Sequence, residues 1–165
     1  MQLQHMASPS QGFTLIELMI VVVITSILLS VAIPAYQSQM IQSRRTEAKT
    51  ALLDLAGREE RFLSTNPQAY TTTATALGYA AFPAAVGSNY YTVTVSCIAP
   101  VAGALACDPN PNPPSGPAYY LTATPVAGTS QANDTQCASF ALDSTGAQFA
   151  FTAAGILNTA YCWLN

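Results

Sequence analysis

The side chains that most often do chemistry in proteins are sparse in this sequence and form no recognisable catalytic set. Four cysteines show no C-x-x-C spacing, and the one histidine is His5. Structural zinc sites normally need closely spaced Cys and His ligands, so no metal site is expected. The sequence also holds no G-x-S-x-G, no H-E-x-x-H and no phosphate-binding glycine loop. It therefore predicts a protein that is not an enzyme and that needs no cofactor.

Carboxylates are the remaining candidates for chemistry. Glu59 and Glu60 are adjacent within a predicted helix, so their side chains point in different directions, and we interpret them as part of a solvated face. Asp108, Asp134 and Asp143 are well separated in the sequence. Because calcium needs clustered oxygen ligands, these aspartates do not predict a calcium site.

Charge is distributed unevenly along the chain. All five basic residues lie between Arg44 and Arg61, and the only formal charges beyond Arg61 are three aspartates. Binding to nucleic acid depends largely on neutralising phosphates, so this distribution counts against a nucleic-acid partner. The alternative, that the protein captures DNA for uptake, can be tested by a salt-dependent gel shift.

One segment has the length and composition of a membrane span. Residues 1–12 are short and polar, and the apolar run over residues 13–35 follows them, whereas an ordinary signal peptide places its apolar region before the cleavage site. The run is long enough to span a bilayer, and a lone segment in lipid satisfies its backbone groups only as a helix. Glu17 lies inside this run, where a carboxylate costs about 2.5–3.5 kcal/mol near the bilayer centre. We therefore expect a cationic partner for Glu17.

The elements that must position these residues are one long helix and a small sheet. Residues 36–65 have the periodicity of an amphipathic helix, which continues the apolar run and ends at Asn66-Pro67. Beyond it, period-two patterns predict strands over residues 90–96, 119–124, 139–143 and 148–151. A turn is expected at residues 144–146 and an irregular, Pro-rich loop at residues 108–114. The fold class is α+β, with the amphipathic half of the helix packed on an antiparallel sheet.

The N-terminal motif reads GFTLIELMIVVVI over residues 12–24, followed by AIPAY over residues 32–36. It closely resembles the class III signal of type IV pilins and related pseudopilins. The resemblance implies cleavage by a prepilin peptidase between Gly12 and Phe13, with N-methylation of Phe13. It also implies that Glu17 pairs with the N-terminal amine of a neighbouring subunit during assembly. Pro34 occupies the position before which the family helix often loses helicity, although this chain has Ser26 where a glycine is common.

The C-terminal region resembles that of a PilE-type minor pilin, with a segment bounded by cysteines and ending in Cys162-Trp163. With a membrane-targeting segment upstream, disulfides in an oxidising compartment are the expected role of the cysteines. Four cysteines permit three connectivities, of which Cys97–Cys107 with Cys137–Cys162 is the simplest. Trp163 is interpreted as a core residue.

The resemblance predicts a structural subunit of a type IV pilus, and a minor pilin more than the major one. Four segments are expected: leader 1–12, filament-core half-helix 13–35, amphipathic half-helix 36–65 and globular β domain 66–165. Expected partners are other pilin subunits, the prepilin peptidase, the inner-membrane assembly machinery and, before assembly, the inner membrane. The chain would then enter an extracellular pilus that serves surface attachment and twitching motility. A major pilin and a pseudopilin of a type II secretion system are alternatives.

Overall fold

The computed structural model describes residues 12–66, 70–96 and 118–164, and its elements confirm the expected α+β fold. In chain order they are α1 (Leu15–Thr65), the 3-10 helix η1 (Ala74–Leu77), β1 (Ala84–Val86), β2 (Tyr91–Ser96), β3 (Tyr120–Pro125), the 3-10 helix η2 (Ser130–Asn133), β4 (Ser139–Asp143), β5 (Gln148–Phe151) and α2 (Thr159–Leu164). The chain divides into two compact units, with the boundary within α1 between Gln39 and Met40.

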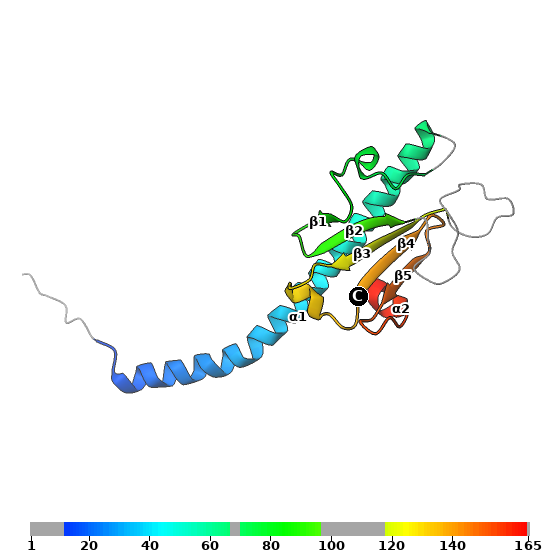
Figure 1. The fold of residues 1–165 in the computed structure, drawn as a ribbon. Coiled ribbons are helices and arrows are strands. Elements are labelled where there is room, and N and C mark those ends of the chain that lie inside the picture. Colours follow the sequence, from blue (N-terminus) through cyan, green and yellow to red (C-terminus); the bar gives the residue numbers. More distant parts are fainter. Residues whose placement is uncertain (1–11, 67–69, 97–117, 165) are drawn as a thin grey trace, which may run out of the picture. The chain divides into compact units, whose positions relative to one another are not determined.

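The second unit contains a five-stranded antiparallel sheet in the order β1-β2-β3-β4-β5, so each strand pairs with its neighbour in sequence (Figure 1). Four of these strands agree with the periodicity of the sequence. β1 was not predicted, because its three residues are too short to show an alternating pattern. It pairs Ala85 with Thr92 at the edge of the sheet.

The core of the second unit lies between α1 and one face of the sheet. Ala48, Leu52 and Leu55 of α1 are fully buried and follow one another at helical spacings of four and three. They share one hydrophobic cluster with alternate residues of the central strands, including Tyr91, Val93, Leu121, Ala123, Phe140 and Leu142. Burying one leucine contributes about 1.5–3 kcal/mol, so this contact is what holds the amphipathic half of α1 on the sheet.

The turn between β4 and β5 forms where the sequence predicts it. Asp143 Oδ1 accepts hydrogen bonds from the backbone amides of Thr145 (2.8 Å) and Ala147 (2.9 Å). Gly146 has a φ of 83°, a conformation that glycine adopts without steric cost. Asp143 therefore stabilises the hairpin turn by accepting backbone hydrogen bonds, as the turn propensity of aspartate suggests.

The short helix α2 was not predicted from the sequence. A six-residue helix is far too short to be stable alone, so its formation depends on tertiary packing. Cys162 of α2 is fully buried in the core cluster, and the Trp163 indole N–H donates to the carbonyl of Phe149 at 2.9 Å. Trp163 also stacks edge-to-face against Phe140, which confirms its interpretation as a core residue.

Candidate functional site

The start of α1 forms a capped helix end immediately after the expected processing position. Gly12 and Phe13 are exposed and precede the helix, and Phe13 keeps 84% of its surface accessible. The Thr14 hydroxyl accepts a hydrogen bond from the backbone amide of Glu17 at 3.3 Å. Thr14 and Glu17 thus match the T-x-x-E pattern of a capping box, with the carboxylate at the positive end of the helix dipole. This capping role of Thr14 was not predicted from the sequence, although its spacing to Glu17 indicates it.

The first unit presents an apolar helical surface on all sides. All its described residues, 12–39, are exposed, and the helix contains a stretch long and apolar enough to cross a membrane. Glu17 is the only charged residue within this range. Isolated exposed apolar residues are ordinary, but a continuous surface of this kind marks a site that lipid or protein covers.

Hydroxyl side chains bond back to the helix in the turns around Pro34. Ser26 donates to the carbonyl of Val22 at 2.7 Å and Ser30 to that of Ile27 at 2.7 Å, and Thr25 donates to the carbonyl of Val21. Pro34 has no amide hydrogen to give to the helix, yet α1 continues through it. Local bonds of this type satisfy serine and threonine hydroxyls without water, as a lipid environment requires.

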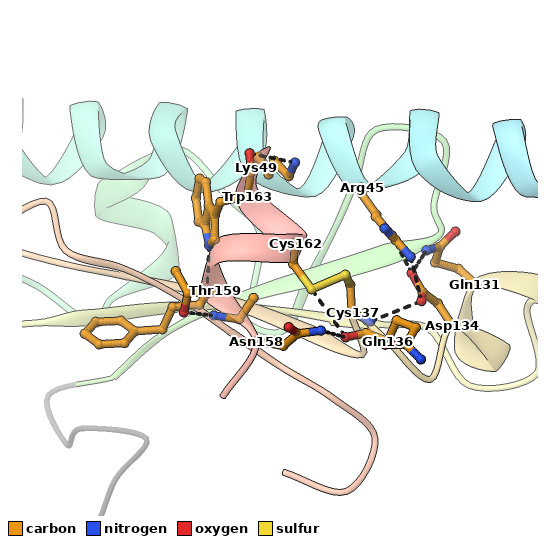
Figure 2. Close-up of a disulfide and its surroundings, with 12 residues drawn as sticks. Arg45, Lys49, Gln131, Asp134, Gln136, Cys137, Asn158, Thr159, Cys162 and Trp163 are labelled. Carbon is orange, nitrogen blue, oxygen red and sulfur yellow. Dashed lines mark hydrogen bonds and ion pairs between the residues drawn. A yellow bond between two sulfur atoms is a disulfide. The ribbon is translucent and has the colours of Figure 1, made fainter. Parts of the chain in front are cut away.

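A buried ion pair within the second unit joins α1 to the loop between η2 and β4 (Figure 2). Arg45 donates two hydrogen bonds to the Asp134 carboxylate, at 2.7 and 3.0 Å. Asp134 also accepts from the backbone amide of Cys137 at 3.1 Å and from the Gln131 amide at 3.3 Å. A carboxylate that one arginine holds on both oxygens is geometrically fixed, so this pair sets the position of the η2–β4 loop on α1.

The Cys137–Cys162 disulfide is present, with Cα atoms 5.7 Å apart, as the sequence analysis proposed (Figure 2). It joins the start of the β4 region to α2. Cys97 and Cys107, whose pairing the sequence also suggests, lie outside the described residues. Among the described residues, no three His, Cys, Asp or Glu side chains are grouped in a way that could hold a metal ion.

Glu59 corrects one of the sequence interpretations. It was expected on a solvated face, but it is fully buried, whereas its neighbour Glu60 is exposed. Glu59 Oε2 accepts from the backbone amide of Thr71 at 3.2 Å, and its Oε1 has no hydrogen-bond partner among the described residues. Burial is the main cause that raises the pKa of Glu59 from 4.5 to about 7, and the nearby Glu60 raises it further. The interpretation failed because residues 70–79 cover this side of the helix, which helical periodicity cannot show.

The basic residues are largely occupied within the second unit. Arg45 is paired with Asp134, and Arg58 forms an ion pair with Asp54 at 2.8 Å. Lys49 donates to the backbone carbonyl of Trp163 at 3.2 Å. Two guanidinium groups are less enclosed: Arg44 lies over the Tyr90 ring and donates to Ser130, and exposed Arg61 donates to the carbonyl of Gly57. The described part of the chain therefore offers little positive charge for phosphate binding.

Comparison with known protein families identifies two regions of the chain. Residues 8–33 match the prokaryotic N-terminal methylation motif. Residues 34–141, well over half of the chain, match the family described as type IV minor pilin ComP, DNA uptake sequence receptor. The boundary between the matches falls beside Pro34, so the first covers the apolar start of α1, and the second covers the rest of α1, β1 to β3 and the start of β4.

Several curated relatives are pilins. The type IV major pilin protein PilA of Myxococcus xanthus is 42% identical over 71 residues, which are 43% of this chain and 32% of the relative. The type IV major fimbrial protein FimA of Dichelobacter nodosus is 44% identical over 69 residues, 35% of this chain and 43% of the relative. The fimbrial protein EcpC of Eikenella corrodens is 46% identical over 54 residues, a third of each chain. The chain thus spans between 32% and 43% of the length of these relatives.

The exposed helix, the sheet that covers its second half and the family matches point to one class of protein. The family is structural rather than enzymatic. The chain belongs to the type IV pilin family, within the group described as type IV minor pilin ComP, DNA uptake sequence receptor.

Proposed function

We propose that this protein is a minor structural subunit of a type IV pilus, assembled through the N-terminal half of α1. The observation that supports this most strongly is the fully exposed apolar surface of residues 13–35, with Glu17 as its one charge. Such a surface is stable only in lipid or among other apolar helices. The same segment therefore serves as membrane anchor before assembly and as filament core afterwards.

Processing follows from the exposed start of the chain's helix. The prepilin peptidase cuts between Gly12 and Phe13, and the new amine of Phe13 is methylated. This step removes the polar leader and creates a cation beside an otherwise apolar helix. The positively charged amine is then the partner of Glu17 in a neighbouring subunit, because an unpaired carboxylate in an apolar environment is costly. Formation of this pair sets the axial register between subunits.

The partners of the chain are other pilin subunits, the prepilin peptidase and the inner-membrane assembly machinery. Before assembly the protein resides in the inner membrane, with the sheet-containing unit in the periplasm. After assembly it lies in an extracellular pilus, where surface attachment and twitching motility are its roles. The disulfide Cys137–Cys162 suits this location, because disulfides persist in oxidising compartments.

Quantitative mass spectrometry of filaments sheared from native cells tests the proposal. A chain that begins at N-methylated Phe13, present at a per-cent level or below, is the expected result for a minor pilin. An abundant chain with the same N-terminus would identify a major pilin instead. A chain that stays in the inner membrane and is missing from the filaments would contradict the pilus assignment and favour a secretion pseudopilin.

The family description provides a second candidate function, reception of DNA for uptake. Against it stands the small number of accessible basic side chains, since Arg45 is buried in its pair with Asp134 and Arg58 is paired with Asp54. A gel shift with short duplex DNA, using the full chain in detergent at low and physiological salt, tests this function. A DNA complex of the wild type that is weaker in the double variant Arg44→Gln, Arg61→Gln would support DNA reception. Absence of any complex at low salt would contradict it.

A further inference from the structure

A group of exposed apolar side chains gathers at the end of the second unit that carries α2. Ile156, Leu157, Tyr161 and Leu164 are each at least 48% exposed, and Leu164 reaches 85%. Leu157 and Tyr161 are four positions apart, and Leu164 follows three positions later. Tyr161 and Leu164 both belong to α2, three positions apart, so they lie on one face of that helix, and Ile156 and Leu157 precede it in the segment where Leu157 bridges to Phe151. We call these four residues the C-terminal apolar patch.

The opposite face of α2 is already used for packing. Cys162 is fully buried by the disulfide and the core, and Trp163 is held by Phe149 and Phe140. The patch therefore remains outward while the helix is fixed from behind. No Asp, Glu, Lys or Arg follows Asp143 in the sequence, so no charged side chain of this segment opposes contact with an apolar phase.

The chain itself limits how far the patch can lie from a membrane. Tyr161 lies near Arg45, whose guanidinium carbon is 5.7 Å from the centre of the Tyr161 ring. Arg45 follows the end of the apolar run at Ala35 by only ten positions. Even a fully extended chain of that length reaches about 35 Å, so an inserted run keeps Arg45 within that distance of its membrane end. A tether of this kind raises the effective concentration of the bilayer around the patch.

We propose that the C-terminal apolar patch docks on the membrane surface before the subunit enters a filament. This inference rests on the proposed membrane anchoring of residues 13–35. Leu157 and Leu164 enter the boundary between headgroups and acyl chains, and the half-exposed Tyr161 ring lies at headgroup level. A phenol ring and aliphatic side chains without charge match the composition of membrane-interface segments.

A bilayer is a better occupant than a protein groove on two grounds. The patch lies on α2 and the segment just before it, and contact with lipid needs no matching shape. The covalent link also makes lipid present around every inserted copy, whereas a second copy must be recruited from solution or from the membrane plane. Extraction into a filament would release the patch, so docking holds the subunit in its membrane state.

The single tryptophan of the chain, Trp163, reports this contact directly. The full-length chain is reconstituted at low density into vesicles of phosphatidylcholine and phosphatidylglycerol, part of which carry bromine in the upper acyl chain. Bromine quenches tryptophan only at short range. We expect clear quenching of Trp163 in the brominated vesicles, because the adjacent Leu164 would be inserted among the upper acyl chains.

Variants separate docking from general insertion. Leu157→Ser and Leu164→Ser each reduce the ratio of docked to free patch by about tenfold, the effect of losing part of one leucine burial. Leu53→Ser is the matched control, since Leu53 is also exposed (53%) but lies on α1 away from the patch sequence. It leaves the quenching unchanged. Flotation of the vesicles after an alkaline wash measures insertion of the helix independently in all variants.

Three results would overturn the inference. Wild-type protein that floats with the vesicles but shows no quenching would be anchored without docking, which leaves the proposed function intact. Protein that the alkaline wash removes would contradict membrane anchoring and the docking with it. Quenching that is absent at low density, with an emission shift that grows with protein density, would assign the patch to a second copy of this chain.

Discussion

At the scale of single residues, two buried charged groups stand out in the second unit. Glu59 is fully enclosed with only the Thr71 amide as a donor, and the Arg45–Asp134 pair is enclosed with nearly all of its hydrogen bonds satisfied. A buried carboxylate without a cation favours its protonated form. Glu59 should therefore give the stability of the protein a pH dependence, whereas loss of one partner of the ion pair should leave the other buried without its hydrogen bonds.

The substitution Glu59→Gln should remove a pH dependence from the stability of the protein. The pKa of Glu59 is about 7 in the folded chain and 4.5 ordinarily, so the folded state keeps a proton that the unfolded state loses between these values. Its contribution to the free energy of unfolding therefore falls as pH rises from about 4.5 to 7, by on the order of 3 kcal/mol. Urea unfolding in detergent at pH 5 and pH 8, followed by Trp163 fluorescence, measures the effect.

The expected outcome is that Glu59→Gln is more stable than the wild type at pH 8 and similar to it near pH 4.5. Glutamine can still accept the hydrogen bond from Thr71. Glu60→Gln is the control, because Glu60 is exposed and should show a wild-type pH profile. A wild-type profile for Glu59→Gln as well would show that Glu59 is ionised in the folded protein.

Removing Asp134 should be among the more damaging single substitutions in this protein. Asp134→Ala leaves Arg45 buried without an anion and frees the amide of Cys137, so the free energy of unfolding should fall by about 3–5 kcal/mol. Replacing both partners by apolar residues, as in Arg45→Met with Asp134→Leu, should recover part of that loss. Urea unfolding of the three variants measures this, and equal losses in the single and double variants would contradict the argument.

At the scale of elements, the turn between β1 and β2 is held to α1 by one carboxylate. Glu47 Oε2 accepts from the backbone amide of Ser88 at 2.9 Å, and Oε1 accepts from its hydroxyl at 3.1 Å. Gly87, next to Ser88, has a φ of 55° and no side chain that could interfere with Glu47. The attachment of the sheet edge to the helix therefore depends on a glycine at this position.

Two glycine-to-alanine substitutions should change the free energy of unfolding in opposite directions. The first tests this attachment and the second is a comparison elsewhere in α1. In Gly87→Ala the new Cβ would lie close against the Glu47 carboxylate, in a backbone conformation that costs an alanine about 1–2 kcal/mol, so stability should fall. In Gly57→Ala no atom lies within 4 Å of the new Cβ, and helix propensity should add about 1 kcal/mol. Thermal or urea unfolding measures both, and stabilisation by Gly87→Ala would contradict the proposed contact.

At the scale of the whole molecule, the exposed apolar helix and the folded sheet unit have different requirements. The sheet unit satisfies its core internally through α1, whereas residues 13–35 need lipid or other helices around them. Glu17 lies in the second environment, and its proposed role concerns assembly rather than folding. Substitution of Glu17 should therefore impair assembly without impairing folding.

The substitution Glu17→Gln should leave membrane insertion intact and impair entry into filaments. Removing the charge lowers the cost of insertion, while the attraction to a neighbouring Phe13 amine is lost. Quantification of the chain in sheared filaments and in the membrane fraction should show a reduction of at least about tenfold in filaments, the effect of losing one charge-assisted hydrogen bond. A normal amount in filaments would contradict the pairing, and Thr14→Ser is a control that keeps the helix cap.

The sequence by itself determined the membrane-length helix, the amphipathic continuation and four of the five strands, because periodicity and length are local properties. It also indicated the Cys137–Cys162 pair and the turn after Asp143. Only the tertiary structure decided that Glu59 is buried, that Arg45 meets Asp134 across 89 positions, and that residues 159–164 form a helix. Each of these depends on which segments cover one another, and segments distant in sequence leave no periodic signal of that contact.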